Sequence, residues 1–237
     1  MLRCDSFVAI FAAAICCYYS NLYAGSSVEA SVAKNSKEYS LDTPEGPPSC
    51  VIKEAIDLVS EGVDLEQFKS RMKAVISRTF DTKAVALFII GRRYVIPEKD
   101  FVRFMDTCMD MVISSYAIWF KNRKNLAFKT LAHREKSSSR IDVPTEIFEV
   151  DENGLPKNVF TMVWSVKSVN GTFLITDVSA DGVSMRALQK DVIAGLIRKK
   201  RSFNKFLKDF LDKKINPNEV AVSANKTTVK KRKEIQQ

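Results

Sequence analysis

The spacing of the hydrophobic side chains changes near Ser137–Ser139, and this change restricts which folds the chain can adopt. Before that point apolar residues recur every three or four positions, which is the spacing of amphipathic helices. After it they alternate as in half-buried strands, and Asn170-Gly171 predicts a two-residue hairpin turn. Helical spacing returns from Leu188 to Leu211. This order predicts an α+β fold in which helices pack on one antiparallel sheet.

Cap and turn residues predict where the elements begin. The first helix is expected from near Cys50, and Asp64 is expected to cap the second. Asp81 should cap a short, very apolar third helix, and Pro97 should open the longest helix, over residues 98–121. Three strands are expected over residues 141–151, 159–169 and 172–180, followed by one long helix that ends near residue 211.

The first 24 residues have the organisation of an export signal. Arg3 lies in a short polar start, an apolar run extends from Phe7 to Tyr19, and Ala24 precedes Gly25. The run is shorter than the roughly 20 residues that a membrane-spanning helix needs. We expect cleavage after Ala24. The alternatives are an uncleaved membrane anchor and a buried N-terminal helix of the domain.

Positive charge is concentrated at the C-terminal end. Residues 198–237 hold 13 Lys or Arg against four Asp or Glu, which accounts for the whole formal charge of +9. Residues 216–237 have little apolar surface to bury and are expected to form a basic, disordered tail. Either this end attracts anionic lipid surfaces or an acidic partner, or it is a solvated face that binds nothing.

The sequence offers few residues for catalysis or metal binding. His133 is the single histidine and lies in a polar stretch, and the eight glycines form no phosphate-binding loop. Asp177 lies among apolar residues, so it is either a general base or an acceptor of backbone hydrogen bonds at the following turn. Cys50 and Cys108 could pair, or Cys108 could be a small buried hydrophobic residue. We therefore predict no enzyme activity, no catalytic residue, no metal and no cofactor.

Two groups of residues occur in the order and spacing of a known family. The first is Phe80-Asp81, Ile90-Gly91, Tyr94, Phe101, Phe104 and Ser115-Tyr116-Ala117. The second runs from Gly171 through Phe173 and Asp177-Val178 to Asp181-Gly182-Val183-Ser184-Met185. Together they resemble the MlaC family of periplasmic phospholipid-binding proteins, also called the toluene-tolerance auxiliary family.

Some positions depart from the family pattern. Phe173 stands where the family usually has tryptophan, and Asp181 replaces its usual glutamate. The run Lys199-Lys200-Arg201 occupies a place where glycine is common, and the usual tyrosine–arginine start of the last helix is absent. Phe173 replaces one aromatic residue with another, and Asp181 replaces one acid with another, so the expected core stays intact.

The resemblance implies an NTF2-like fold with an apolar pocket between helices and a curved sheet. It also implies a phospholipid carrier in the periplasm that works with an inner-membrane ABC transporter, its ring-forming lipid-binding subunit and an outer-membrane lipoprotein complex. The expected organisation is a signal peptide over residues 1–24, a flexible lead-in over 25–49, a lipid-binding domain over 50–215 and the tail over 216–237. We expect a monomer that binds no nucleic acid.

The residues expected to line the pocket come from helices, strands and the turn before the last helix. They are Phe88, Phe104, Cys108, Met111, Val112, Tyr116, Phe160, Met162, Trp164, Val166, Phe173, Ile175, Val183 and Met185. Two other functions stay open at this stage. One is a small enzyme on a related cone-shaped α+β fold, and the other is a membrane-surface binder that uses the basic C-terminus.

Overall fold

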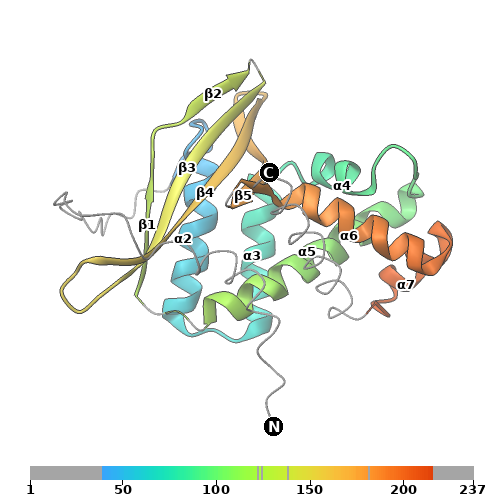
Figure 1. Ribbon diagram of the computed structural model, residues 1–237, viewed down its shortest axis with the longest axis horizontal. Helices are drawn as coiled ribbons and strands as arrows, with labels where there is room; N and C mark the ends of the chain where they lie inside the picture. Colours follow the sequence, from blue (N-terminus) through green and yellow to red (C-terminus); the bar gives the residue numbers. More distant parts are fainter. Residues whose placement is uncertain (1–38, 122, 124, 138, 181, 216–237) are drawn as a thin grey trace, which may run out of the picture.

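The protein is an antiparallel sheet with helices packed against it, as the computed structural model in Figure 1 shows. It describes residues 39–215 apart from 122, 124, 138 and 181. Within this part the strand order is β1-β3-β4-β5-β6, and β2 also pairs with β3. The helices are α2 (Gly46–Glu61), α3 (Leu65–Thr79), α4 (Thr82–Ile90), α5 (Glu98–Lys121), α6 (Met185–Lys200) and α7 (Phe203–Leu211). The strands are β1 (Leu126–Thr130), β2 (Arg134–Ser137), β3 (Arg140–Val150), β4 (Pro156–Val169), β5 (Thr172–Ala180) and β6 (Val183–Ser184). The predicted fold class is confirmed.

The helix boundaries follow from their capping residues. The Asp64 side chain accepts a hydrogen bond from the Gln67 N–H at 2.8 Å, and Asp81 accepts one from the Ala84 N–H at 2.9 Å. Helix α2 begins four residues before Cys50 because prolines are tolerated in a first turn, where N–H groups have no intrahelical partner. The expected N-caps of α3 and α4 and the bounds of α5 are confirmed.

The sheet contains the three expected strands, and its central hairpin has the expected turn. Asn170 and Gly171 have φ angles of 52° and 83°, as a two-residue hairpin of the primed type requires. The expectation of only three strands is wrong, since β1, β2 and β6 add to them. Strands β1 and β2 pair with the same side of β3, and the break between them lies opposite Pro144, which has no N–H to donate. Each piece is therefore too short to show clear alternation in the sequence.

The expectation of one long closing helix is also wrong. Helix α6 ends at Arg201, which has a left-handed backbone with φ of 55°, and the Ser202 hydroxyl caps α7 by accepting from the Lys205 N–H. The apolar spacing continues through this break, so it hides the corner between the two helices. Phe206, Leu207 and Phe210 of α7 are buried, and Lys205 and Lys208 face solvent.

Two hydrophobic clusters form the core, and α5 contributes to both. Its Ile113 lies in the cluster between the sheet and helices α2 and α3. Its Phe104 lies in a second cluster with α4, α6 and α7, where its ring is 5.3 Å from that of Phe210. Figure 1 shows α4, α6 and α7 extending beyond the sheet at the far end of α5. The space between the sheet and the helices is not completely filled.

Candidate functional site

A cavity of about 240 Å³ lies between the inner face of the sheet and the helices. Well-packed protein interiors contain few voids larger than a water molecule, so a space of this size is a distinct feature. Its wall is built mostly of hydrocarbon side chains and sulfur atoms. An environment of this kind suits an apolar ligand better than a reacting polar substrate.

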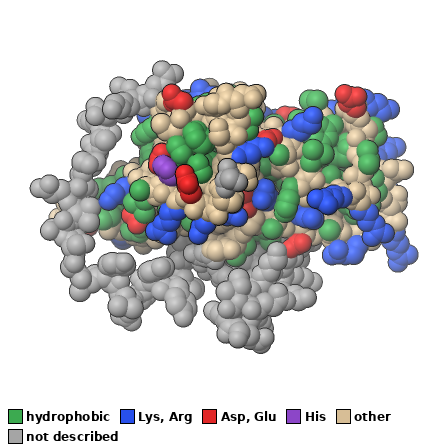
Figure 2. Space-filling view, turned by 90° about the horizontal axis from the view of Figure 1, so that it is seen from above, with side chains coloured by type: hydrophobic (Ala, Val, Ile, Leu, Met, Phe, Trp, Pro, Cys, Tyr) green, Lys and Arg blue, Asp and Glu red, His purple; other side chains and the backbone are tan. Residues whose placement is uncertain are grey.

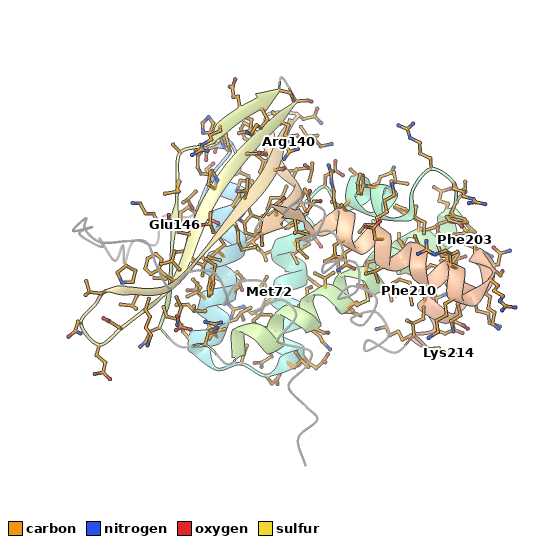
Figure 3. The ribbon with its side chains drawn as sticks, in the orientation of Figure 1. Met72, Arg140, Glu146, Phe203, Phe210 and Lys214 are labelled. Atoms are coloured by element: carbon orange, nitrogen blue, oxygen red, sulfur yellow. The ribbon has the colours of Figure 1, made fainter. Side chains whose placement is uncertain are left out.

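Four helices supply most of the apolar wall. Helix α5 crosses beneath the sheet and presents one face to the cavity, while α2, α3 and α4 close the sides. Met72 in Figure 3 marks the helical side. The helical residues are Val51, Ile52, Ala55, Phe68, Met72, Ile76, Val85, Ala86, Ile89, Met105, Cys108, Met109, Val112 and Ile113.

The sheet supplies the opposite wall, mainly from β4 and β5. Phe160, Met162 and Trp164 alternate along β4 and therefore share the inner face. The Trp164 indole N–H donates to the Thr145 hydroxyl at 2.8 Å, which satisfies its only polar group inside the core. The remaining apolar residues are Ile147, Val178 and Ala180 from the strands, Phe80 from the turn before α4, and Met185 from the start of α6.

Five of the seven methionines of the protein line this one cavity. The methionine side chain is unbranched and polarizable, and it adapts to ligands of variable shape. Met72, Met105 and Met109 come from the helices, Met162 from the sheet and Met185 from the start of α6. The wall can therefore adjust to more than one arrangement of a flexible chain.

Polar groups occupy one corner of the cavity, where β5 meets the start of α6. Both oxygens of the Asp177 carboxylate are engaged there, by the Val178 and Arg186 N–H groups and by the Ser184 hydroxyl at 2.6 Å. The Arg186 guanidinium lies 3.5 Å from this carboxylate and 4.4 Å from the centre of the Phe88 ring. Asp177 therefore anchors the turn and the helix start, which is the hydrogen-bonding role that the sequence suggested as the alternative to a general base.

The other titratable groups in the described part of the chain do not form a catalytic constellation with this corner. His133 is bound to Glu45 at 2.6 Å, beside the start of α2. Burial raises the pKa of the Cys108 thiol to about 12, so this residue is a protonated, apolar part of the wall. Cys50 and Cys108 are not joined to each other by a disulfide. Within residues 39–215, as described, no group of acids, histidines and cysteines is arranged to hold a metal ion.

The structure brings six of the fourteen predicted pocket residues into the cavity wall. They are Cys108, Val112, Phe160, Met162, Trp164 and Met185. Val166 and Ile175 lie on the sheet in fully packed core, and Phe104 and Met111 belong to the second cluster. Phe88 lies beneath Arg186 and Lys190.

Three predicted residues remain. Phe173 packs against the edge of the first cluster, Val183 pairs with Ala180 in the sheet, and the side chain of Tyr116 is outside the described part of the chain. Sequence reasoning missed the contributions of α2 and α3, and from α4 it chose Phe88 where the structure places Val85, Ala86 and Ile89 in the wall. The apolar stripes of these helices are visible in the sequence, but spacing alone does not show whether a stripe packs on a neighbour or faces a cavity.

The profile of the family described as MlaC protein matches residues 51–211, which is more than half of the chain. The chain belongs to the MlaC family. The expected resemblance is therefore confirmed, although no curated protein matches the chain by sequence. Among the described residues no helix is long and apolar enough to cross a membrane.

A solved structure has the same fold. It is the phospholipid-binding protein from Ralstonia solanacearum, determined in complex with a phospholipid. The two structures superpose with a TM-score of 0.60 at 16% sequence identity, over 76% of this chain and 98% of that chain. The helices-on-sheet architecture of this MlaC-family chain is thus shared with a protein of known structure.

Proposed function

We propose that this protein binds a phospholipid in the cavity and carries it between the outer and inner membranes for an ABC-type lipid transport system. The observation that carries the proposal is the methionine-rich, apolar cavity between the helices and the sheet. An engineered apolar cavity of roughly 150 Å³ stays dry and takes up apolar molecules. A larger cavity of the same character would favour acyl chains over water, at about 0.8 kcal/mol for each buried methylene.

Membership of the MlaC family supports a binding protein rather than an enzyme, and the phospholipid in the Ralstonia protein supports the choice of ligand. The acyl chains would lie between α5 and the strand face of Phe160, Met162 and Trp164. The headgroup would remain near solvent. Such a carrier needs no catalytic residue, but it needs partners that accept the lipid.

Export to the periplasm and the two transport partners are inferred from the sequence. Export to the periplasm rests on the segment from Phe7 to Ala24, which lies outside the described residues. The partners we propose are an inner-membrane ABC transporter with a ring-forming lipid-binding subunit and an outer-membrane lipoprotein complex. Both follow from the family resemblance.

The test is lipid extraction and mass spectrometry of protein purified from the envelope of its own host. The wild-type protein should yield phospholipid in stoichiometric amounts, and its intact mass should correspond to a chain that begins at Gly25. Val112→Trp should fill the cavity and Met162→Arg should place a charge in it. Each change should lower the lipid content at least about fivefold, because burying an unpaired charge or losing chain contacts costs several kcal/mol.

Lys136→Ala, on the exposed strand β2, is the matched control and should keep its lipid. Circular dichroism establishes that each variant is folded. If the wild-type protein contains no phospholipid, or if both cavity variants keep it, these side chains form an ordinary core and the carrier function is rejected. A mass that includes Met1 would reject the export part alone.

A further inference from the structure

Helix α4 separates the cavity from solvent, and its two sides have different chemistry. On the inner side Val85, Ala86 and Ile89 line the cavity. On the outer side Lys83 is exposed, and Leu87 is 51% exposed. A leucine in water next to a lysine is ordinary by itself. Here, however, the leucine lies on a wall one helix thick, directly outside the cavity.

Basic side chains from two elements surround the outer side of α4. Arg92 and Arg93 follow the helix directly and face solvent. Lys190 of α6 is exposed, and its Nζ lies 4.9 Å from the centre of the Phe88 ring. The loop between α4 and α5 also carries Val95, which is 82% exposed. We call this surface the α4 face, and it consists of Lys83, Leu87, Arg92, Arg93, Val95 and Lys190.

Among the described residues, the basic side chains of the α4 face form no ion pair with the acids closest to them in sequence. Asp81 is engaged by Lys167 at 2.6 Å, and Asp177 by Arg186. Glu98 and Asp100, in the first turn of α5, are the acids that follow the loop in sequence. Lys83, Arg92, Arg93 and Lys190 form no ion pair with any described residue. Figure 2 views the molecule from the side on which α4 lies and shows Lys and Arg interspersed with hydrophobic side chains at this end.

We propose that the α4 face docks the protein on an anionic lipid bilayer. Long basic side chains around single exposed aliphatic residues match a surface of anionic headgroups over hydrocarbon. Protein interfaces instead concentrate their binding energy in large anchors seated in well-packed pockets, whereas Leu87 and Val95 are single aliphatic residues exposed to solvent. Docking in this way would place α4 as the single layer between the bilayer and the cavity. A role of this layer in passing lipid between the bilayer and the cavity rests on the proposed function, whereas the docking itself does not.

The test is co-sedimentation of the full chain with vesicles of phosphatidylglycerol and phosphatidylcholine, and with vesicles of phosphatidylcholine alone. Binding should require the anionic lipid and weaken between about 50 mM and about 300 mM salt, because screening shortens the reach of the charges. Each basic side chain near an anionic surface contributes about fivefold to affinity. The double variant Arg92→Gln/Arg93→Gln should therefore bind the anionic vesicles about tenfold more weakly, or weaker still.

The matched control removes the same charge elsewhere. Arg134→Gln/Lys136→Gln lies on the exposed strand β2 and should bind as the wild-type protein does. A second measurement follows the apolar contact directly. The tryptophan of Val95→Trp should be quenched by vesicles whose acyl chains carry bromine, to a greater extent than the native tryptophans.

Equal losses in the two double variants, or no loss in either, would show that another part of the chain binds the vesicles, and would overturn the proposal. Binding to soluble polyglutamate with no binding to vesicles would assign the face to an acidic polypeptide and would also overturn it. The lipid content of the same preparations distinguishes the two ideas. A wild-type protein that carries no phospholipid but docks through the α4 face contradicts only the proposed function.

Discussion

At the scale of single residues, Asp177 shows how one side chain positions an edge of the cavity. Its Oδ1 accepts from the Val178 and Arg186 N–H groups at 2.9 and 3.2 Å, and its Oδ2 accepts from the Ser184 hydroxyl. These bonds join the end of β5 to the first turn of α6. A negative charge at this position is also stabilised by the positive end of the helix dipole. The side chains of Met185 and Arg186, which line the cavity, are held in place by this connection.

Replacement of this carboxylate should destabilise the domain. In Asp177→Asn the amide group retains one accepting oxygen but presents N–H donors to the Ser184 hydroxyl and to Arg186. We expect a loss of about 1–3 kcal/mol in the free energy of unfolding, because hydrogen bonds to a charged acceptor are the stronger ones. Urea denaturation measures it. Glu152→Gln, in the exposed turn before β4, is the control and should change the stability by less than about 0.5 kcal/mol. An equally small change in both variants would show that the contacts of Asp177 contribute little.

The sequence predicted several of these single-residue roles because they depend on local geometry. The caps at Asp64 and Asp81 and the turn at Asn170-Gly171 depend on residues within four positions of each other. The position of Arg186 over Phe88 could not be predicted, because it joins residues almost 100 positions apart. Contacts of that kind depend on the topology of the whole fold.

At the scale of elements, the corner between α6 and α7 contains a strained residue. Arg201 adopts a left-handed backbone with φ of 55° at the end of α6, where helices commonly end in glycine. A residue with a Cβ atom is disfavoured there by about 1 kcal/mol.

Arg201→Gly should therefore stabilise the protein by about 0.5–1 kcal/mol, measured as a higher midpoint of urea denaturation at an unchanged slope. The control places the same substitution one turn earlier. Arg198→Gly lies inside α6 and should destabilise by about 1 kcal/mol, because glycine is unfavourable within a helix. If both substitutions destabilise to the same extent, the side chain of Arg201 makes contacts that outweigh the backbone strain.

Prediction of the elements failed where the hydrophobic pattern was ambiguous. The long helix 98–121 was predicted correctly because its stripe is regular and Pro97 opens it. Strands β1 and β2 were missed, since five and four residues are too few to establish alternation. The break at Arg201 was missed because apolar residues keep the same spacing on both sides. The sequence signal for the corner is Ser202, a residue type that favours the N-cap position and that caps α7 here.

At the scale of the whole molecule, the cavity exists because five helices and three strands meet around a space that none of them fills. Sequence predicts which side chains are apolar and on which face they lie, but both a packed core and an empty cavity are lined by such side chains. Val166 and Val112 illustrate the limit. Both were predicted to contact the ligand, yet Val166 is fully enclosed in the sheet core and Val112 faces the cavity.

Cys108 gives a chemical probe of this space. Its pKa of about 12, against an ordinary value of 9.0, follows from burial, and the thiol side chain lines the cavity. Because the neutral thiol is favoured in the folded protein, this residue leaves the free energy of unfolding unchanged below about pH 9. Between pH 9 and about 12 the unfolded chain ionises at this site while the folded one does not, so the protein should lose stability as the pH rises.

The same thiol should report whether the cavity is filled. At pH 8 iodoacetamide should alkylate Cys108 about a hundredfold more slowly in the folded protein than in the denatured chain, or more slowly still, because only the thiolate reacts. Removal of bound phospholipid should accelerate the reaction by opening a path along the wall, and adding phospholipid vesicles should slow it again. Peptide mass spectrometry separates this site from Cys50, which lies against the backbone of Tyr39 and serves as the internal reference. If the rate at Cys108 is the same with and without phospholipid while Cys50 is unchanged, the space beside α5 does not open to lipid, and the acyl chains must lie elsewhere in the fold.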